Sequence, residues 1–485
     1  MRFRREAVPP VLRAASLLAW LLLALAALRG ILFIAAEPML AVANNFDMIR
    51  VQACIDVFPA RADDVPIEAS SHRAPLERYR FAHSDSPCFI TSELLFAALA
   101  VPGMWVEQAI RDDATFSLRW QGWIKLALLL AFAAAVTHRL LALGRADLAV
   151  GHAALVALVL CDPGNLVYFN TFYAQAAAVL FLYALLAGTV VVVATDAEPS
   201  RIALVALGLC AALLALTKLQ HAVLPLAIVV LLLPLAWRHP QRWRRPLLAM
   251  VIGGVVGGGV QVVQMNSAHT VGIARANIVN TVFPTMLPES ADVARTMAEL
   301  GLSERCLQAV GKSWYMRGMQ DGSLCPESLE LSRGRVTRVL LANPMIIWRM
   351  VNGAIERMRP WLSPHLGMVA GLDLAPLPAG VPTLARIIEA MPMAVWKFGL
   401  LGLPLLACVM ALRRTHGAQV AGNALLMTCC VLPLFITGVA VYGDGYVDLH
   451  AHTHLAFPLS MVALVLVAWM LAMDLVAGLR ALRMS

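Results

Sequence analysis

Residues 14–36 read AASLLAWLLLALAALRGILFIAA, and the polar stretch NNFDMIR follows them at 44–50. A helix needs roughly 20 apolar residues to cross a bilayer, so the first stretch predicts a spanning helix. Several arginines precede this helix, and arginine-flanked ends stay on the cytoplasmic side. Asp47 is therefore predicted to lie on the far side, near the lipid headgroups, where a carboxylate can act on a substrate with a lipid-buried tail.

The composition indicates an all-α polytopic membrane protein. Of the 485 residues, 60% are hydrophobic and 14% are charged, whereas globular domains carry about 25% charged residues. The net charge of +8 lies largely in the predicted cytoplasmic connections, so it indicates topology rather than nucleic-acid binding. The chain contains no Gly-rich phosphate loop followed by Lys and Ser or Thr, which argues against nucleotide chemistry.

Arginines cluster in the predicted inner connections, whereas Lys218 is the one basic residue of the short outer turns. This asymmetry predicts that both termini lie in the cytoplasm. We predict about ten spans, with nine to twelve as the range that the two short spans leave open. They are 14–36, 120–142, 147–162, 173–194, 202–217, 222–237, 247–265, 392–412, 421–441 and 455–478.

Two long segments, 37–118 and 266–391, are predicted to lie outside the cytoplasm. They divide the chain into an N-terminal transmembrane module (1–265), a helical cap (266–391) and C-terminal transmembrane helices (392–485). Short interfacial helices are expected in both segments. Helical spacing and Pro signals predict them at about 47–58, 91–110, 290–310, 326–341 and 345–358.

Four of the nine cysteines lie in these outer segments. Cys54 and Cys88 share the first segment, and Cys306 and Cys325 share the second. Even pairs in an oxidising compartment predict one disulfide within each segment, with four free thiols as the alternative. A glycine cluster at 253–259 lies inside a predicted span, where it favours close packing of helices.

Polar residues at the predicted outer edges are candidates for function. Asp47 is either a general base or a helix cap. Asp162, followed by Pro and Gly, is either a site residue or a turn former. Lys218 either attracts a phosphate or anchors its span at the headgroups. Arg29, inside the first span, is a functional candidate or a snorkelling side chain.

Three histidines alternate at the start of the last predicted span, in YGDGYVDLHAHTH at 442–454. His450 and His454 share one face of a helix, and all three share a face of a strand. Metal binding, contact with a phosphate or another polar group, and ordinary loop composition remain open for His450, His452 and His454.

An acid, a lysine, an arginine and histidines around one membrane face suit a sugar carried on polyprenyl phosphate. The carrier supplies the activated bond, so no nucleotide and no cofactor is required, although a divalent metal is compatible. Cations would stabilise the leaving phosphate, and a carboxylate would deprotonate the acceptor hydroxyl. Direct displacement would invert the anomeric centre.

The chain resembles the GT-C superfamily of integral-membrane glycosyltransferases, in its early acid after span one, its large late outer segment and its many apolar helices. Several stretches are similar to a bacterial group of glycan-biosynthesis hexose transferases. They are NNFD at 44–47, YFNTFY at 168–173, KLQ at 218–220, NIVNTVFPTMLP at 277–288, ELGL at 299–302, GKSWY at 311–315 and DLH at 448–450.

The resemblance implies that Asp47 is the catalytic acid of the first outer segment and that Asp162 is a second acid near it. Gln175 stands where the group would have Glu, and His452 and His454 stand where a basic residue is frequent. The residues expected to bind the donor phosphate or substrate are Arg29, Asn44, Asn45, Arg50, Asn170, Tyr173, Gln175, Lys218, Gln220, His450 and His454.

The expected function is transfer of a sugar from a polyprenyl-phosphate carrier to a periplasmic glycan or glycolipid at a bacterial inner membrane. The expected partners are this donor, the acceptor and the bilayer, without nucleic acid. A flippase or transporter of lipid-linked sugars is one alternative. An O-antigen ligase or polymerase that uses a diphosphate-linked donor is another.

Overall fold

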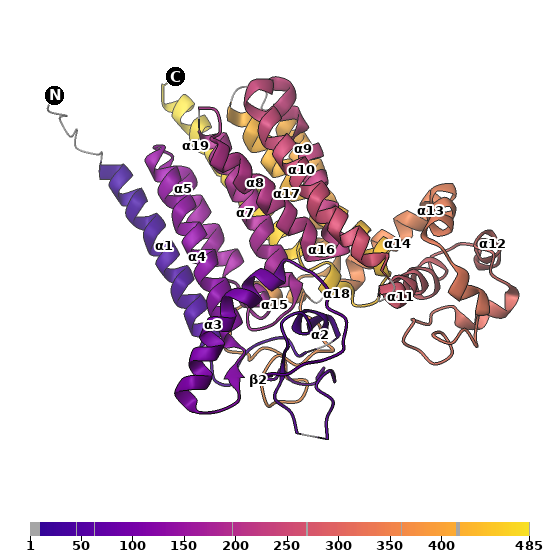
Figure 1. Ribbon diagram of the computed structural model, residues 1–485. Helices are drawn as coiled ribbons and strands as arrows, with labels where there is room; N and C mark the ends of the chain where they lie inside the picture. Colours follow the sequence, from indigo (N-terminus) through magenta and orange to yellow (C-terminus); the bar gives the residue numbers. More distant parts are fainter. Residues whose placement is uncertain are drawn as a thin grey trace.

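Apolar helices occupy all ten of the predicted spans. The computed structural model describes residues 10–44, 46–62, 64–195, 197–267, 270–359, 361–413 and 418–484. In Figure 1, α1 starts and α19 ends at the top of the bundle, while the two long segments lie at the bottom, which we call the loop-rich end. The bundle helices are α1 (Pro10–Ile34), α4 (Arg119–Ala142), α5 (Ala146–Leu155) with the π-helical turn η1 (Val156–Leu160), α7 (Ala174–Ala194), α8 (Arg201–Thr217), α9 (Leu224–Arg238), α10 (Pro240–Met265), α16 (Met393–Arg413), α17 (Ala418–Asp444) and α19 (Ala456–Met484).

The prediction of an all-α polytopic fold is confirmed. Among the described residues, eight helices are long and apolar enough to cross a membrane, and three further apolar helices are shorter. Seven of the eight, together with the three shorter ones, correspond to the predicted spans. The eighth is α3 (Glu93–Arg111), which we predicted as an interfacial helix. It lies at the loop-rich end and contains Pro102, and its place relative to a membrane stays a prediction (Figure 1).

The glycines of α10 allow it to pack closely on α8, as their position in the sequence predicted. A Cβ atom on Gly253 would collide with the carbonyl oxygen of Gly208, and one on Gly257 would collide with that of Ala212. Both collisions are with backbone, which cannot rotate away as a side chain can. The close approach therefore requires glycine at these two positions.

The first long segment combines short helices with a small sheet. It contains α2 (Phe46–Gln52), β1 (Val57–Pro59), β2 (Arg78–Phe81), α3 and β3 (Phe116–Ser117). The strands are antiparallel in the order β1-β2-β3, with Val57 opposite Phe81 and Tyr79 opposite Phe116. The sheet was not predicted, and the helix expected at 47–58 ends at Gln52. The predicted disulfide between Cys54 and Cys88 is confirmed.

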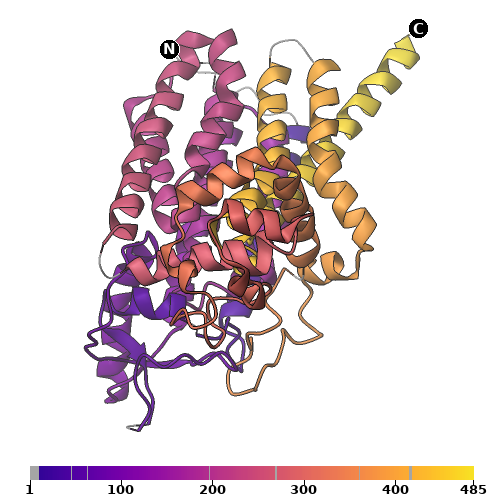
Figure 2. The same ribbon diagram turned by 90° about the vertical axis from the view of Figure 1, so that its right-hand side faces the viewer.

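The second long segment forms a helical lobe beside the bundle. Figure 1 shows α11 to α14 projecting from the loop-rich end, and in Figure 2 this lobe faces the viewer. The predicted disulfide between Cys306 and Cys325 is confirmed here. The lobe consists of α11 (Val271–Thr281), η4 (Val282–Met286), α12 (Val293–Glu299), η5 (Glu304–Ala309), η6 (Pro326–Glu330), α13 (Arg333–Ala342) and α14 (Pro344–Arg357).

Helix boundaries in the lobe correct two predictions. The helix expected at 290–310 is divided into the short α12, whose start is capped by Asp292 through the Arg295 amide at 2.9 Å, and the 3-10 turn η5. The helix expected at 326–341 is split into η6 and α13, because Ser332 caps α13 at the split. Capping side chains start new helices inside both ranges. The helix expected at 345–358 is confirmed as α14.

Residues after α14 return to the first long segment. Leu40 and Val369 form an antiparallel bridge, and the amides of Ala41 and Ala43 donate to the carbonyls of Met368 and Gly367 at 3.1 and 2.9 Å. This part of the chain then forms α15 (Leu384–Ala390) and enters α16. The two long segments are therefore joined directly beneath the bundle, next to α2.

Candidate active site

Asp47 lies in the first turn of α2 and pairs with two cations. The Lys218 Nζ atom is 3.1 Å from Asp47 Oδ2, and an Arg50 nitrogen, one turn along α2, is 3.6 Å from Oδ1. Lys218 reaches this position because its backbone is extended, with φ −153° and ψ 154°, between α8 and the turn η2 (Leu219–His221). The structure thus brings together three residues that the sequence predicted as site members.

The electrostatics of this group favour an ionised Asp47. Burial opposes the charge, but Lys218, Arg50 and His452 outweigh it and hold the pKa of Asp47 well below its usual range. The Asp47 side chain is 31% exposed, so it is accessible from solvent as well as paired. The result is a permanent carboxylate in a cationic setting at the loop-rich end.

His452, in the short helix α18 (Leu449–His452), connects this group to the end of α17. Its Nδ1 is 2.7 Å from Gln220 Oε1 and its Nε2 is 3.1 Å from Asp444 Oδ2. The orientation of the Gln220 amide follows from its Nε2, which donates to the His452 carbonyl at 2.9 Å. His452 therefore connects Gln220, which lies two residues after Lys218, to Asp444 through its two ring nitrogens.

Asp444 in turn anchors the helical lobe to the site. Asn280 donates to Asp444 Oδ1 at 2.9 Å, and the Trp314 amide donates to Asn280 Oδ1 at 2.8 Å. Tyr315, the next residue, interacts electrostatically with Asp47 and Asp444. The lobe therefore contributes an exposed tyrosine to the surroundings of Asp47.

The other two histidines of the alternating triplet differ from His452. His454 is buried and accepts a hydrogen bond on Nδ1 from Trp361 Nε1 at 3.0 Å. His450 is half-buried, and its ring centroid is 6.2 Å from that of His365. Of these, His454 also interacts electrostatically with Lys218. Sequence reasoning chose His450 and His454 as binding residues and omitted His452, which is the histidine coupled to Asp47.

Several predicted residues hold the backbone around the site rather than the Asp47 group itself. Tyr173 donates to the Ala43 carbonyl at 2.8 Å, just before α2. Asn170 donates to the Leu40 carbonyl at 3.1 Å. Gln175 donates to the Ala451 carbonyl, also at 3.1 Å, within α18. These three contacts set the positions of the two segments that carry Asp47 and His452.

The two asparagines of NNFD, Asn44 and Asn45, were also predicted to bind the substrate. The Asn44 side chain is buried, and its amide has no hydrogen-bond partner among the described residues. Asn45, predicted as a binding residue, lies outside the described residues. The binding roles of both stay predictions.

Arg29 and Asp162 form a separate ion pair. Arg29 Nη2 is 2.9 Å from Asp162 Oδ2, and Asp162 is fully buried. Asp162 also accepts from the Gly164 amide at 2.9 Å, from Thr383 Oγ1 at 2.6 Å and from the Leu384 amide at 2.9 Å. It caps the turn helix α6 (Pro163–Leu166) and ties α1 to α15. A catalytic role of Asp162 stays a prediction.

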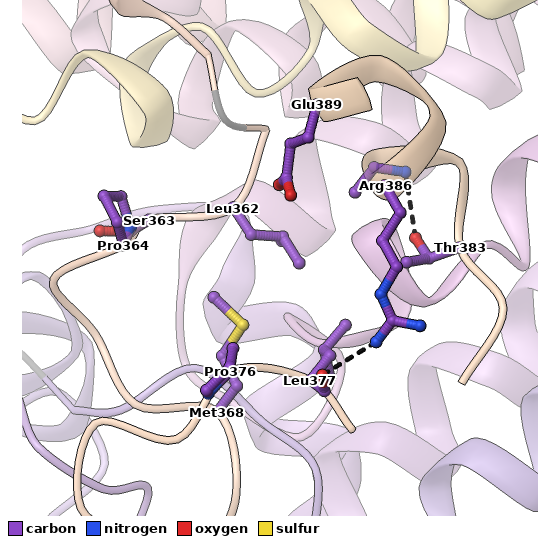
Figure 3. Close-up of a pocket in the computed structure, with 10 residues that line it drawn as sticks. Leu362, Ser363, Pro364, Met368, Pro376, Leu377, Thr383, Arg386 and Glu389 are labelled. Carbon is purple, nitrogen blue, oxygen red and sulfur yellow. Dashed lines mark hydrogen bonds between the residues drawn. The ribbon is translucent and has the colours of Figure 1, made fainter. Parts of the chain in front are cut away.

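A pocket of about 170 Å³ opens beside α15, and its lining does not include Asp47, Lys218 or His452 (Figure 3). Its lining is mostly apolar, from residues such as Leu362, Met368 and Leu377. Arg386 projects into it, donating to the Leu377 carbonyl at 2.9 Å, and Glu389 lies opposite. Thr383 lines the same pocket and bonds to Asp162.

One group of possible metal ligands occurs in the described part of the chain, namely Cys306, Cys325 and Glu327. The two cysteines form a disulfide, so their sulfurs are not thiolate ligands.

The fold and the site define a polytopic α-helical membrane protein with a polar, charged site at one end of its bundle. The chain belongs to the family described as the YfdI N-terminal transmembrane domain, whose family model matches residues 13–480. A comparison with curated proteins finds no match.

One solved structure is similar, the archaeal oligosaccharyltransferase AglB from Archaeoglobus fulgidus, in complex with an inhibitory peptide and a dolichol-phosphate. The identity is 12%, the TM-score is 0.40, and the match covers 96% of this chain and 51% of that one. The chain thus spans about half the length of this protein.

Proposed function

We propose that this protein is an integral-membrane glycosyltransferase of the GT-C type. It would move a sugar from a polyprenyl-phosphate carrier to a glycan or glycolipid acceptor. The observation that carries the proposal is the Asp47 carboxylate, held ionised by Lys218 and Arg50 at the loop-rich end of an apolar bundle. A site at this position serves a substrate whose tail lies in lipid and whose phosphate lies at the headgroups.

Asp47 acts as the general base in this proposal. The acceptor hydroxyl gives its proton to Asp47 while its oxygen attacks the anomeric carbon. The bond between that carbon and the phosphate oxygen breaks, and its electron pair leaves with the phosphate. A single displacement inverts the anomeric centre, and a positioned base contributes roughly 10² to 10⁴-fold in rate.

Lys218 and Arg50 receive the phosphate, whose negative charge grows as it leaves. The same cations pair with Asp47 in the structure, so an incoming phosphate competes with the carboxylate for them. Once they are shared, the ionised form of Asp47 is less stabilised and its basicity rises. Donor binding would thereby activate the base.

Further support comes from the residues around the site and from the predicted orientation of the chain in the membrane. Gln220 holds His452 near Asp47, and Tyr173 and Gln175 fix the adjoining backbone. The arginine distribution supports placing this end outside the cytoplasm of a bacterium, at the inner membrane, with both termini in the cytoplasm. The scheme uses no cofactor and no metal.

The test begins with lipid that copurifies with the protein, analysed by mass spectrometry, which should contain polyprenyl monophosphate or its hexose-linked form. Proteoliposomes with the identified donor should then release polyprenyl phosphate as the sugar is transferred. Asp47→Asn should lower turnover at least 100-fold. Asp64→Asn is the matched control, because Asp64 is exposed in the same segment.

The outcomes separate the alternatives. Lipid movement across the bilayer without breakage of the sugar–phosphate bond would identify a flippase. Release of a diphosphate carrier would identify a ligase or polymerase. Turnover by Asp47→Asn near that of the unchanged protein would remove Asp47 as the base.

A further inference from the structure

His454 is held in a closed aromatic environment immediately after α18. Its ring centroid is 4.6 Å from that of Tyr168, in an edge-on arrangement, and 5.9 Å from that of Trp361. Trp361 is itself fully buried and stacks on Phe457 at 5.2 Å, so the indole cannot turn freely. The imidazole orientation is therefore set by its neighbours.

The contact with Trp361 also settles where the imidazole proton lies. An indole N–H can only donate, so His454 Nδ1, 3.0 Å from Trp361 Nε1, must accept. A neutral imidazole that accepts on Nδ1 carries its proton on Nε2. This Nε2–H is buried and has no hydrogen-bond partner among the described residues.

A buried donor without a partner loses its hydrogen bonds to water without replacement, and native proteins keep few of them. The donor lies near the Asp47 group, because Gln220, two residues after Lys218, donates to the carbonyl of His452, two residues before His454, at 2.9 Å. Three titratable groups face His454 from the elements packed on it: Lys218 and His221 around η2, and Tyr168 from the turn before α7. Burial, followed by Lys218, lowers the pKa of His454 to about 3, so the ring is neutral at physiological pH.

We propose that His454 Nε2–H is a fixed, uncharged donor to an oxygen of the phosphate that binds at Lys218, with Trp361 as the positioning residue that holds the tautomer. This inference rests on the proposed function for the identity of the phosphate. An uncharged donor adds a directed hydrogen bond without adding repulsion toward Lys218. A phosphate oxygen reaches it as Lys218 exchanges Asp47 for the ligand.

Two substitutions distinguish the roles of the two ring nitrogens of His454. In His454→Gln, the amide nitrogen can take the place of Nε2, which keeps the donor and loses the Trp361 bond. In His454→Asn, the amide oxygen can take the place of Nδ1, which keeps the Trp361 bond and loses the donor. The probe is geranylgeranyl monophosphate, with geranylgeraniol as the control for tail binding alone, titrated against the full chain in detergent.

At pH 7 we expect His454→Gln to bind the monophosphate within about threefold of the unchanged protein. His454→Asn should bind it roughly tenfold or more weakly, since a hydrogen bond to a charged group is lost. Geranylgeraniol binding should be the same for both variants. Equal monophosphate affinity of the two variants, or the reverse order, would overturn the assignment of Nε2–H.

Trp361→Phe tests the positioning role separately. Without the indole donor, the proton of the neutral ring can move from Nε2 to Nδ1. The ¹⁵N chemical shifts of the His454 ring should then show both neutral tautomers, and monophosphate affinity should fall. A merely structural Trp361 would lower affinity while the ring shifts kept the Nε2–H tautomer. These binding readouts need no catalysis, so they can fail while the Asp47 turnover test succeeds, and the converse also holds.

Discussion

Lys218 and Asp47 form an ion pair of 3.1 Å between the end of a bundle helix and the first turn of α2. The two residues are distant in sequence, and their ion pair joins the end of α8 to α2 at the site. Because the carboxylate and the proposed phosphate compete for the same ammonium group, Lys218 links donor binding to the state of the base. This relationship leads to two predictions about the site, and three more concern its scaffold.

Lys218→Met should weaken binding of geranylgeranyl monophosphate by roughly tenfold or more, because a charge-assisted contact with the phosphate is removed. The maximal rate with saturating donor should fall less than the affinity does. Titration and steady-state kinetics would measure the two effects. Lys312→Met, on the lobe, is the matched control, and an unchanged affinity in Lys218→Met would exclude the phosphate role.

The pH dependence follows from the depressed pKa of Asp47. Burial is outweighed by Lys218, Arg50 and His452, so the folded pKa lies below the unfolded value of roughly 3.9. The stabilisation from the ionised carboxylate is complete above that unfolded value and is lost as the pH falls toward the folded pKa. In the unchanged protein, protonation of Asp47 should therefore not limit turnover between pH 5 and 8.

Lys218→Met should move the acid limb of the pH–rate profile upward, since the cation that lowers the pKa of Asp47 most is removed while burial remains. Profiles of kcat/KM for the two proteins would show the shift. A downward shift, or identical limbs, would contradict the assignment of this limb to Asp47.

Asp162→Asn should destabilise the protein while leaving the Asp47 group intact. The substitution leaves Arg29 without its partner carboxylate and weakens the bonds from Thr383 and Leu384. Breaking a buried pair costs about 3 kcal/mol, so thermal unfolding in detergent should shift down by several degrees. Asp64→Asn should not shift it. Loss of turnover without any loss of stability would instead indicate that Asp162 acts in catalysis.

The disulfide between Cys54 and Cys88 should stabilise the segment that carries α2. It closes a loop of 34 residues, for which chain entropy gives about 3–4 kcal/mol. The double variant Cys54→Ser/Cys88→Ser should unfold at lower temperature and bind the monophosphate more weakly. Cys408→Ser, at an exposed free thiol, should change neither quantity.

Gly257→Leu should separate α8 from α10, because its side chain would meet the backbone of Ala212. Overpacking of this kind costs roughly 1–3 kcal/mol, which should appear as a lower unfolding temperature. Gly259→Leu is the matched control, since the space around that position is open. Equal stability of the two variants would show that α8 and α10 do not need this close approach.

Local signals in the sequence predicted the bundle well. Hydropathy predicts a helix such as α7 without knowledge of its neighbours. Two cysteines in one segment outside the cytoplasm, where conditions are oxidising, were enough to predict the disulfide between Cys306 and Cys325. The strands β1 to β3 were missed because each is only two to four residues long and depends on partners outside its own stretch. The extent of α12 was overestimated because helical spacing continues past Gly301, whose left-handed backbone, at φ +70°, ends the helix.

Site residues could be predicted from the sequence only where they flank a predicted span. Asp47 follows the first span and Lys218 ends another, so the predicted topology placed both at the same face of the membrane. His452 could not be distinguished from His450 and His454 by spacing. The backbone of Asp448, at φ +47°, precedes α18 in a left-handed conformation, and the three rings have different partners. Of the three, His452 is the histidine whose ring contacts the Asp444 carboxylate.

Residues 39–43 pair with residues 367–370, so the strand that completes the Asp47 region is among the later parts of the chain to be synthesised. During translation, residues 39–43 leave the ribosome before residues 367–370 have been made. Their backbone groups therefore wait for these partners while the ribosome makes most of the remaining helices. Contacts of such high sequence separation form slowly. The backbone around Asp47 is therefore completed only after residue 367 has been made, and the contact of His452 with Asp444 forms later still.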